Sequence, residues 1–597
     1  DLLLNDDGSK LYVACVNSDT VVVIDTAKNS VAERILVRPD AALPFGSMPN
    51  ALALRGDTLY VANGGNNAIA VVQLNEDAPA TVEGFIPTGW CPGALTIHED
   101  QLLVANVKGV GPRTTQPNKD GHNVHQHRGT ITQIELNLDD VQLAAHTTKV
   151  KEYASTPAAL RAWERGQVNA KPVPVPKKLG EPSPIEHIVY IIKENRTYDQ
   201  VLGDMSQGNN DASLCIFPRK ISPNHHALAE QFVQLDNYYC NGVNSADGHA
   251  WSTEGNVTDH LEKSFGGFTR SYTFGDDPLS YSSTGFLWDN VLSHGLSFRN
   301  YGEMDYASPV PEDKSFTDVY TDFINKTPGI TFTQKIGIAK LQQYTAQDYP
   351  GWNMRIPDVL RADAFLTELK AYEKRGYWPN LSIVYLPNDH TSGTSENMPT
   401  PAAHMADNDL ALGRIVDGLS HSPFWKKMAI FIIEDDPQNG FDHVDGHRSI
   451  CFVVSPWAKR GALVSDFYNQ TSVLHTMQRI LALPPMNQMD AMAPVMHSCF
   501  QEEPDFTPYT HLPNIQPLDE LNPVITALNT DEQHWATLSA AQDFDHVDAA
   551  DETSLNMILW HAMKGVDAPY PTAQSGAHGT GLKALGLDFS GEEDEDD

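Results

Sequence analysis

The sequence predicts a multidomain protein: a partial set of β-propeller blades followed by an α/β domain with a mostly parallel sheet covered by helices. A strand pattern repeats within the first part of the chain. Strand-like and helix-like segments alternate from Pro184 onward, which is typical of an α/β domain. Three unalternating apolar runs, at residues 187–193, 381–386 and 428–433, suit strands that are buried on both faces.

The repeat in the first part is a strand with the pattern Leu-(Tyr/Leu)-Val-Ala, and its alanines are 48 and 43 residues apart. The copies occupy residues 10–15, 58–63 and 101–106, and a second strand follows each copy at residues 20–25, 68–73 and 129–134. Several short strands in a repeat of about 40–50 residues are typical of propeller blades. The pattern resembles the YVTN-type β-propeller family.

Residues 1–145 hold about three such blades, fewer than the four to eight or so that close a ring. We therefore expect further blades upstream of Asp1, and a short partial stack of sheets is the alternative. Residues 107–128 form a polar insertion whose histidines, His122, His125 and His127, are expected to be solvated. The Pro-rich segment 146–184 is predicted to be a semi-rigid linker.

Periodicity and charge define the rest of the chain. Apolar residues at helical spacing predict helices at 357–375 and 550–564. Residues 571–597 end in an acidic run and are expected to be disordered. Cys215 and Cys240 flank a predicted helix and are candidates for a disulfide in an oxidising compartment.

Composition excludes some classes of partner. The chain has 597 residues, of which 41 are basic and 77 acidic, and its net charge is −36. Such a charge repels nucleic acid and anionic membrane surfaces. No apolar stretch approaches the roughly 20 residues that a membrane span needs. We therefore expect neither nucleic-acid binding nor membrane insertion.

Polar side chains follow each of the three apolar runs. The first run stops at Glu194-Asn195, the second leads to Asp389-His390, and the third stops at Glu434-Asp435-Asp436. Ligand sites in parallel sheets lie at the carboxyl ends of the strands, so these groups are expected to converge on one edge. Carboxylate, amide and imidazole groups together predict a divalent-metal site.

Five motifs carry a resemblance that covers roughly residues 184–570. They begin at 186–199 and continue at 235–239, 243–249, 386–391 and 433–448, with a closing segment at 468–472. In this order they resemble the phosphoesterase family of bacterial phospholipases C and acid phosphatases, within the alkaline-phosphatase superfamily. The resemblance implies an alkaline-phosphatase-like domain at 185–570, with a cap inserted at about 263–350, and a periplasmic or extracellular location.

The resemblance also implies roles for individual residues. Glu194, Asn195, Asp435 and Asp436 would hold one metal ion. The Ser245 hydroxyl would complete the shell as the nucleophile and form a covalent phosphoserine. Ser252 or Thr253 are alternatives for the nucleophile.

For a second group of residues the resemblance leaves two roles open. Asp389, His390 and His443 would bind a second metal ion or, in a one-metal site, contact phosphate or protonate the leaving group. His249 and His447 are candidates for contacts with substrate oxygens. Segment 224–226, Asn-His-His, is a weaker candidate.

Many superfamily members have Asp-His where this chain has Asp435-Asp436. An all-oxygen shell favours calcium, magnesium, manganese or iron over zinc. We therefore expect a phosphoesterase with one or two divalent ions, acting on a small phosphorylated molecule, with a propeller that contacts a cell-surface or protein partner. The alternatives are a non-catalytic surface or assembly protein, and a phosphodiesterase, phospholipase C or sulfatase on the same scaffold. Without the other motifs, each acidic segment would be an ordinary turn.

Overall fold

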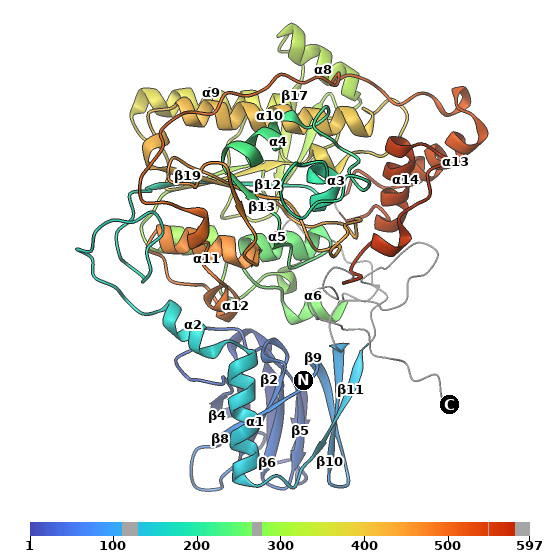
Figure 1. Ribbon diagram of the computed structural model, residues 1–597. Coiled ribbons are helices and arrows are strands. Elements are labelled where there is room, and N and C mark those ends of the chain that lie inside the picture. Colours follow the sequence, from blue (N-terminus) through green and yellow to red (C-terminus); the bar gives the residue numbers. More distant parts are fainter. Residues whose placement is uncertain (110–128, 265–276, 547, 580–597) are drawn as a thin grey trace.

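The computed structural model describes residues 1–109, 129–264, 277–546 and 548–579. Figure 1 shows three antiparallel sheets at one end of the molecule and a larger α/β body at the other. The His-containing insertion predicted at 107–128 falls largely outside the described residues, as do its three histidines.

The three sequence repeats form three antiparallel sheets. The first sheet contains β1 (Leu2–Leu4), β2 (Lys10–Cys15), β3 (Thr20–Asp25) and β4 (Ser30–Leu36). The second contains β5 (Pro49–Arg55), β6 (Thr58–Asn63), β7 (Ala68–Gln73) and β8 (Thr81–Pro87). The third contains β9 (Trp90–His98), β10 (Gln101–Gly109) and β11 (Thr130–Glu135). The repeated strand is the second of each sheet, as a blade repeat requires, and the described residues form three sheets rather than a closed ring.

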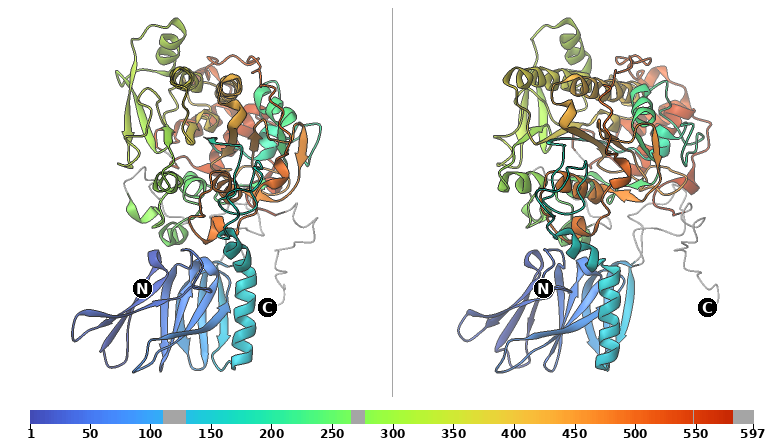
Figure 2. Two further views of the ribbon diagram at one scale, coloured as in Figure 1. Left: turned by 90° about the vertical axis from the view of Figure 1, so that its left-hand side faces the viewer. Right: turned by 60° about the vertical axis from the view of Figure 1, so that its left-hand side comes forward.

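The segment predicted as a semi-rigid linker, 146–184, is partly helical. Helix α1 (Asp140–Tyr153) begins at the capping box of Asp139 and Gln142, and α2 (Thr156–Ala162) follows it. Both views of Figure 2 show α1 beside the N-terminal sheets. The Thr147 hydroxyl accepts a hydrogen bond from the Phe85 amide of β8 at 2.8 Å. Helix α1 lacks a wide apolar stripe, so the sequence pattern gave little signal for it.

The α/β body is built on a seven-stranded sheet with the order β15-β18-β12-β19-β20-β13-β21. Its strands are β12 (His187–Lys193), β13 (Val233–Leu235), β15 (Phe298–Tyr301), β18 (Leu381–Leu386), β19 (Met428–Glu434), β20 (Cys451–Val454) and β21 (Ala462–Val464). Strand β20 runs antiparallel to both of its neighbours, so the sheet is mixed and largely parallel. The three apolar runs are the central strands β18, β12 and β19, which are buried along almost their whole length.

Helices cover both faces of this sheet (Figure 1). Helices α4 (Pro223–Gln231), α9 (Asp358–Arg375) and α10 (Pro401–His421) lie on one face, and α5 (Ser245–Thr253) and α11 (Gln470–Ile480) lie on the other. The remaining helices are α3 (Tyr198–Leu202), α6 (Asp259–Ser264), α7 (Leu287–Ser293), α8 (Phe316–Asn325), α12 (Gln488–Met492), α13 (Thr530–Ala540) and α14 (Glu552–Lys564). Helices α9 and α14 confirm the two helices predicted from periodicity.

The segment predicted as a cap, 263–350, contributes to the main sheet as well. It contains β15, which pairs with β18 at the edge of that sheet. The rest includes α7, α8 and a hairpin of β16 (Asp305–Val310) and β17 (Thr331–Ile336). Two short strands, β14 (Tyr238–Tyr239) and β22 (Tyr468–Asn469), pair beside the body.

Two further expectations change. Residues 571–579, predicted as part of a disordered tail, are packed: Ala577 is buried and the Gly579 amide donates to Asp445 at 3.0 Å. Cys215 and Cys240 are not joined, and each thiol contacts a backbone carbonyl oxygen instead, of Val201 and of Glu434. In the part of the chain that the structure describes, no helix combines the length and apolar character needed to cross a bilayer.

Candidate active site

The carboxyl ends of β12, β18 and β19 meet at one edge of the sheet, where a buried lysine joins two acids. Lys193, the last residue of β12, lies 2.6 Å from Asp389 and 2.6 Å from Glu434, and all three side chains are inaccessible to solvent. Burial lowers the pKa of Lys193, but the two carboxylates outweigh burial and raise it. Asp389 also accepts from the Glu194 amide at 3.1 Å, so its side chain is held by the protein itself.

The residues that follow Lys193 and Glu434 in the chain form a second group of side chains. We call it the carboxylate cluster: Glu194, Asn195, Asp435 and Asp436. The Asn195 side-chain amide lies 2.8 Å from Glu194 Oε2, 3.0 Å from Asp435 Oδ1 and 3.0 Å from Asp436 Oδ2. Asn195 adopts the left-handed backbone conformation, with φ of 66°, which turns its side chain back toward the strand ends. The sequence prediction that these four residues converge matches this geometry.

The cluster is electrostatically unfavourable without a cation. Burial, and then the neighbouring carboxylates, raise the pKa of Asp435 and Asp436 well above the usual value. Asp435 Oδ2 is buried and receives no hydrogen bond. Carboxylate and amide oxygens with an unused lone pair are the donors that a divalent cation needs, so these residues fit such an ion.

Ser245 is the first residue of α5 and faces the cluster. Its hydroxyl lies 3.1 Å from Asp436 Oδ2 and 3.5 Å from Glu194 Oε2. The Asn244 side chain caps the helix by accepting from the Asp247 amide. Close packing sets the position of α5, because a Cβ at Gly248 would lie 2.5 Å from the Asp435 carbonyl oxygen.

The alternative nucleophiles have other contacts. The Ser252 hydroxyl accepts from the Gln470 amide at 2.8 Å, and the Thr253 hydroxyl donates to the His249 carbonyl at 2.7 Å. Ser245 is therefore the hydroxyl of the three whose hydrogen bonds reach the carboxylate cluster.

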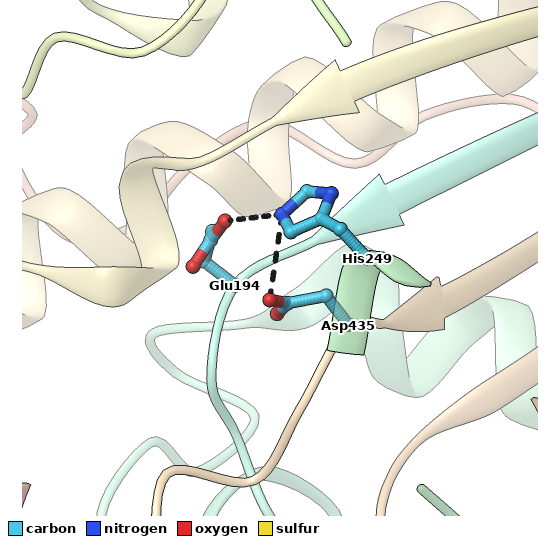
Figure 3. A group of neighbouring side chains, drawn as sticks. All are labelled: Glu194, His249 and Asp435. Atoms are coloured by element: carbon cyan, nitrogen blue, oxygen red, sulfur yellow. Dashed lines mark hydrogen bonds and ion pairs between the residues drawn. The ribbon is translucent and has the colours of Figure 1, made fainter. Parts of the chain in front are cut away.

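His249, one turn after Ser245 on α5, also reaches the strand ends. Figure 3 shows its Nε2 facing one oxygen of Glu194, at 3.3 Å, and one of Asp435, at 3.4 Å. Its Nδ1 lies 2.8 Å from Glu303 Oε1. Burial lowers the pKa of His249, but Glu303 and Glu194 outweigh burial and raise it to about 10.

The structure does not assemble the predicted second group. Among the described residues, Asp389, His390 and His443 do not form one set of neighbouring ligand atoms. Asp389 is held by Lys193, and His443 lies 2.6 Å from Asp199 of α3. The Arg448 guanidinium contacts Asp199 and Asp442 at 3.0 Å, so this second acidic group already has a cation from the protein.

The remaining predicted histidines border the site or lie away from it. His390 is buried, with Nδ1 2.8 Å from the Thr391 carbonyl, and burial lowers its pKa. His447 contacts Asp445 and lines a cavity of about 680 Å³ between the N-terminal sheets and the α/β body. Within segment 224–226, His225 is held by Asp409 at 2.7 Å.

Sequence reasoning missed three residues around the cluster. Lys193 carried a signal, since a lysine inside a buried apolar strand requires an acidic partner. Glu303 and Asp548 lie in loops without a pattern that singles them out. The Asp548 carboxylate accepts from the backbone amides of Ser245 and Ala246, at 2.7 and 2.6 Å, and so occupies the N-terminus of α5.

Comparison with known proteins gives one family match. The model of the phosphoesterase family matches residues 205–484, slightly less than half of the chain. The matched region includes Ser245, Asp435 and Asp436, and it begins after Glu194 and Asn195. None of the curated proteins matches this chain. The family match supports hydrolysis of esters.

Solved structures show distant similarity. A protein of the alkaline phosphatase superfamily from Vibrio parahaemolyticus is 14% identical over 70% of this chain and 96% of its own, with a TM-score of 0.35. The hydrazine synthase of Kuenenia stuttgartiensis is 23% identical over 18% of this chain and 28% of its own, with a TM-score of 0.15. A putative 6-phosphogluconolactonase from Bacteroides uniformis is 20% identical over 23% and 40%, with a TM-score of 0.17. At these scores the similarities establish neither a reaction nor a ligand for this chain.

Proposed function

We propose that this protein hydrolyses phosphate esters with the help of a divalent cation, and that Ser245 is the nucleophile. The observation that carries the proposal is the Ser245 hydroxyl, which lies 3.1 Å from Asp436 and 3.5 Å from Glu194 at the edge of a buried carboxylate cluster. The phosphoesterase family match supports the same reaction class.

Glu194, Asn195, Asp435 and Asp436 would hold the cation. When bound, the ion would neutralise charge on the phosphoryl oxygens and lower the pKa of the Ser245 hydroxyl. A single ion is favoured, because the residues predicted for a second one pair with Lys193 and Asp199 instead. Calcium, magnesium, manganese, iron and zinc remain candidates for its identity.

The chain's own groups account for the remaining steps. The proton of Ser245 has acceptors in the carboxylates of Asp436 and Glu194, and the serine oxygen attacks phosphorus as the bond to the alcohol breaks. The alcohol takes up the proton that Asp436 or Glu194 received from Ser245, because His390, whose Nδ1 is bound to the Thr391 carbonyl and whose pKa burial lowers, is neutral. Water then cleaves the phosphoserine and releases inorganic phosphate, which restores the serine hydroxyl.

The N-terminus of α5 would hold the phosphoryl oxygens. The amides of Ser245 and Ala246 point at an anion, which in this structure is the Asp548 carboxylate. We propose that substrate displaces this carboxylate. The substrate would then be a small phosphorylated molecule that competes with an intramolecular acid.

The N-terminal sheets are proposed to serve recognition. The cavity of about 680 Å³ is lined from both parts of the molecule, with Trp90 and Lys108 on one side and Trp251 and His447 on the other. A partner or an extended substrate that enters there would contact both. In this proposal residues 1–145 form the recognition part, residues 146–184 the linker and residues 185–570 the catalytic part.

Hydrolysis of p-nitrophenyl phosphate, bis-p-nitrophenyl phosphate and p-nitrophenyl sulfate tests the reaction, before and after chelation and with each divalent ion restored. We expect the phosphate esters to be cleaved and chelation to abolish turnover. Ser245→Ala should lower kcat by at least about 10³-fold while the metal content stays unchanged. Ser252→Ala, on the same helix, is the matched control and should keep activity.

Two results would contradict the proposal. An unchanged rate in Ser245→Ala would place the nucleophile elsewhere. Absence of turnover with every ion and ester would favour a non-catalytic binding role for the α/β body, and preferential cleavage of the sulfate ester would change the substrate class.

A further inference from the structure

The imidazole of His249 lies between two groups of acids that belong to different parts of the chain. Nδ1 lies 2.8 Å from Glu303, which follows the edge strand β15, and Nε2 lies 3.3 and 3.4 Å from Glu194 and Asp435 at the ends of β12 and β19. His249 and Glu303 are both inaccessible to solvent. A buried ring with acceptors on both sides has a defined orientation.

The hydrogen bond to Glu303 determines which nitrogen carries a proton. A carboxylate oxygen only accepts, so Nδ1 is the donor in that contact. The lone pair of the other nitrogen, in this tautomer, points at the oxygens of Glu194 and Asp435 (Figure 3). Lone pairs that face one another at such distances require a cation between them or a second proton on the ring.

The ligand atoms of Glu194, His249 and Asp435 lie within 4.8 Å of one another, which is close enough for one ion to contact all three. Asp435 Oδ2, the oxygen nearest to His249, is buried and accepts no hydrogen bond. The same carboxylates belong to the carboxylate cluster, so the imidazole borders the proposed ion site directly.

We infer that His249 supplies a nitrogen ligand to the ion of the carboxylate cluster, and that Glu303 is the positioning residue that holds His249 in the required tautomer. A metal-binding histidine generally donates its other ring nitrogen to a carboxylate in this way. The inference rests on the proposed metal-dependent function and deepens it.

The consequence concerns the identity of the ion. The sequence predicts an all-oxygen shell, which favours calcium, magnesium, manganese or iron over zinc. A mixed oxygen and nitrogen shell shifts the preference away from calcium and magnesium and toward iron or zinc. This preference does not follow from the Asp435-Asp436 pair, because the nitrogen comes from helix α5.

Pulsed EPR of the Mn²⁺-loaded full chain tests the ligand. We expect ¹⁴N coupling from an imidazole in the wild type, loss of this coupling in His249→Gln, and retention in His447→Gln as the matched control. A wild-type spectrum without ¹⁴N coupling, or coupling that persists in His249→Gln, would overturn the assignment of His249.

Titration of metal-free protein with Mn²⁺ tests Glu303. We expect Glu303→Ala to weaken Mn²⁺ binding by about 10–100-fold, and Glu303→Gln, which keeps an acceptor for Nδ1, to restore part of the affinity. Glu368→Gln is the matched control, because it removes a carboxylate that pairs with Arg299 of the edge strand β15. This variant should bind Mn²⁺ with the affinity of the wild type. Equal affinity in the wild type, Glu303→Ala and Glu303→Gln would contradict the positioning role.

These measurements report binding and not turnover. If Mn²⁺ supports ester hydrolysis and no ¹⁴N coupling is seen, the proposed function stands and this inference fails. If the coupling is present and no ester is cleaved with any ion, the ligand assignment stands and the proposed function fails.

Discussion

At the scale of single residues, the ion pairs of the buried acids determine which carboxylates are available to bind a cation. Asp389, Glu434 and Asp435 all lie at the carboxyl ends of apolar strands, yet the carboxylates of Asp389 and Glu434 contact Lys193 and do not join the cluster. Lys193 thus removes two of the acids at this edge from the set of available ligands. Among the described residues, no basic side chain lies as close as 2.6 Å to the remaining acids, Glu194, Asp435 and Asp436. His249 lies 3.3 Å from Glu194 and 3.4 Å from Asp435.

Lys193→Met should destabilise the fold by about 3–5 kcal/mol, because it leaves two buried carboxylates without their cation. Chemical unfolding of the metal-free protein measures this difference. Lys427→Met removes an exposed lysine that pairs with Glu186 and should change stability by less than about 1 kcal/mol. Equal stability of the two variants would show that Asp389 and Glu434 are neutral without Lys193.

At the scale of elements, helix α5 brings two groups to the strand ends on successive turns. Ser245 and His249 are four residues apart, so both lie on the same face of the helix. The Gln470 amide of α11 donates to the carbonyl oxygens of Gly248 and Asp435, which ties the helix to the loop after β19. The position of Ser245 therefore depends on the contact between α5 and the loop after β19.

Gly248→Ala tests this packing. A methyl group there would lie 2.5 Å from the Asp435 carbonyl oxygen and 2.7 Å from its carbon, so the helix or the loop must shift. We expect kcat to fall by about 10²-fold or more, since a displacement near 1 Å misplaces the nucleophile. Gly295→Ala is the control: its added methyl group would meet nothing within 4 Å, and we expect kcat to stay unchanged. An unchanged kcat in Gly248→Ala would show that the contact does not position Ser245.

At the scale of the whole molecule, the sequence predicted the parts that depend on local pattern. The three repeats identified three sheets, and the apolar runs identified the central strands whose ends carry Glu194 and Asp435. The sequence did not predict that Asp389 and His443 have partners elsewhere, because Lys193 and Asp199 reach them only in the folded chain. Glu303 was beyond sequence reasoning for the same reason.

The many buried acids make the stability of the metal-free protein depend on pH. Burial raises the pKa of Asp305 and Asp358 to about 7, and Glu303 and Glu194 raise that of His249 to about 10 against the effect of burial. Each of these groups binds protons more strongly in the folded than in the unfolded chain. Their contribution to stability is therefore present at low pH and is lost as pH rises through the folded-state pKa.

Between pH 6.5 and 8 we expect the metal-free protein to lose about 1–2 kcal/mol of stability, from Asp305 and Asp358 alone. Buried histidines such as His225, whose pKa burial lowers to about 4, act in the opposite direction, but mainly below pH 6.5. Chemical unfolding at several pH values measures the slope. The substitutions Asp305→Asn and Asp358→Asn should reduce the dependence of stability on pH. A cation in the carboxylate cluster should raise stability most at pH 8, where protons compete least for Asp435 and Asp436. A flat or rising stability between pH 6.5 and 8 would contradict the prediction, because it would show that Asp305 and Asp358 are already ionised in the folded chain at pH 6.5.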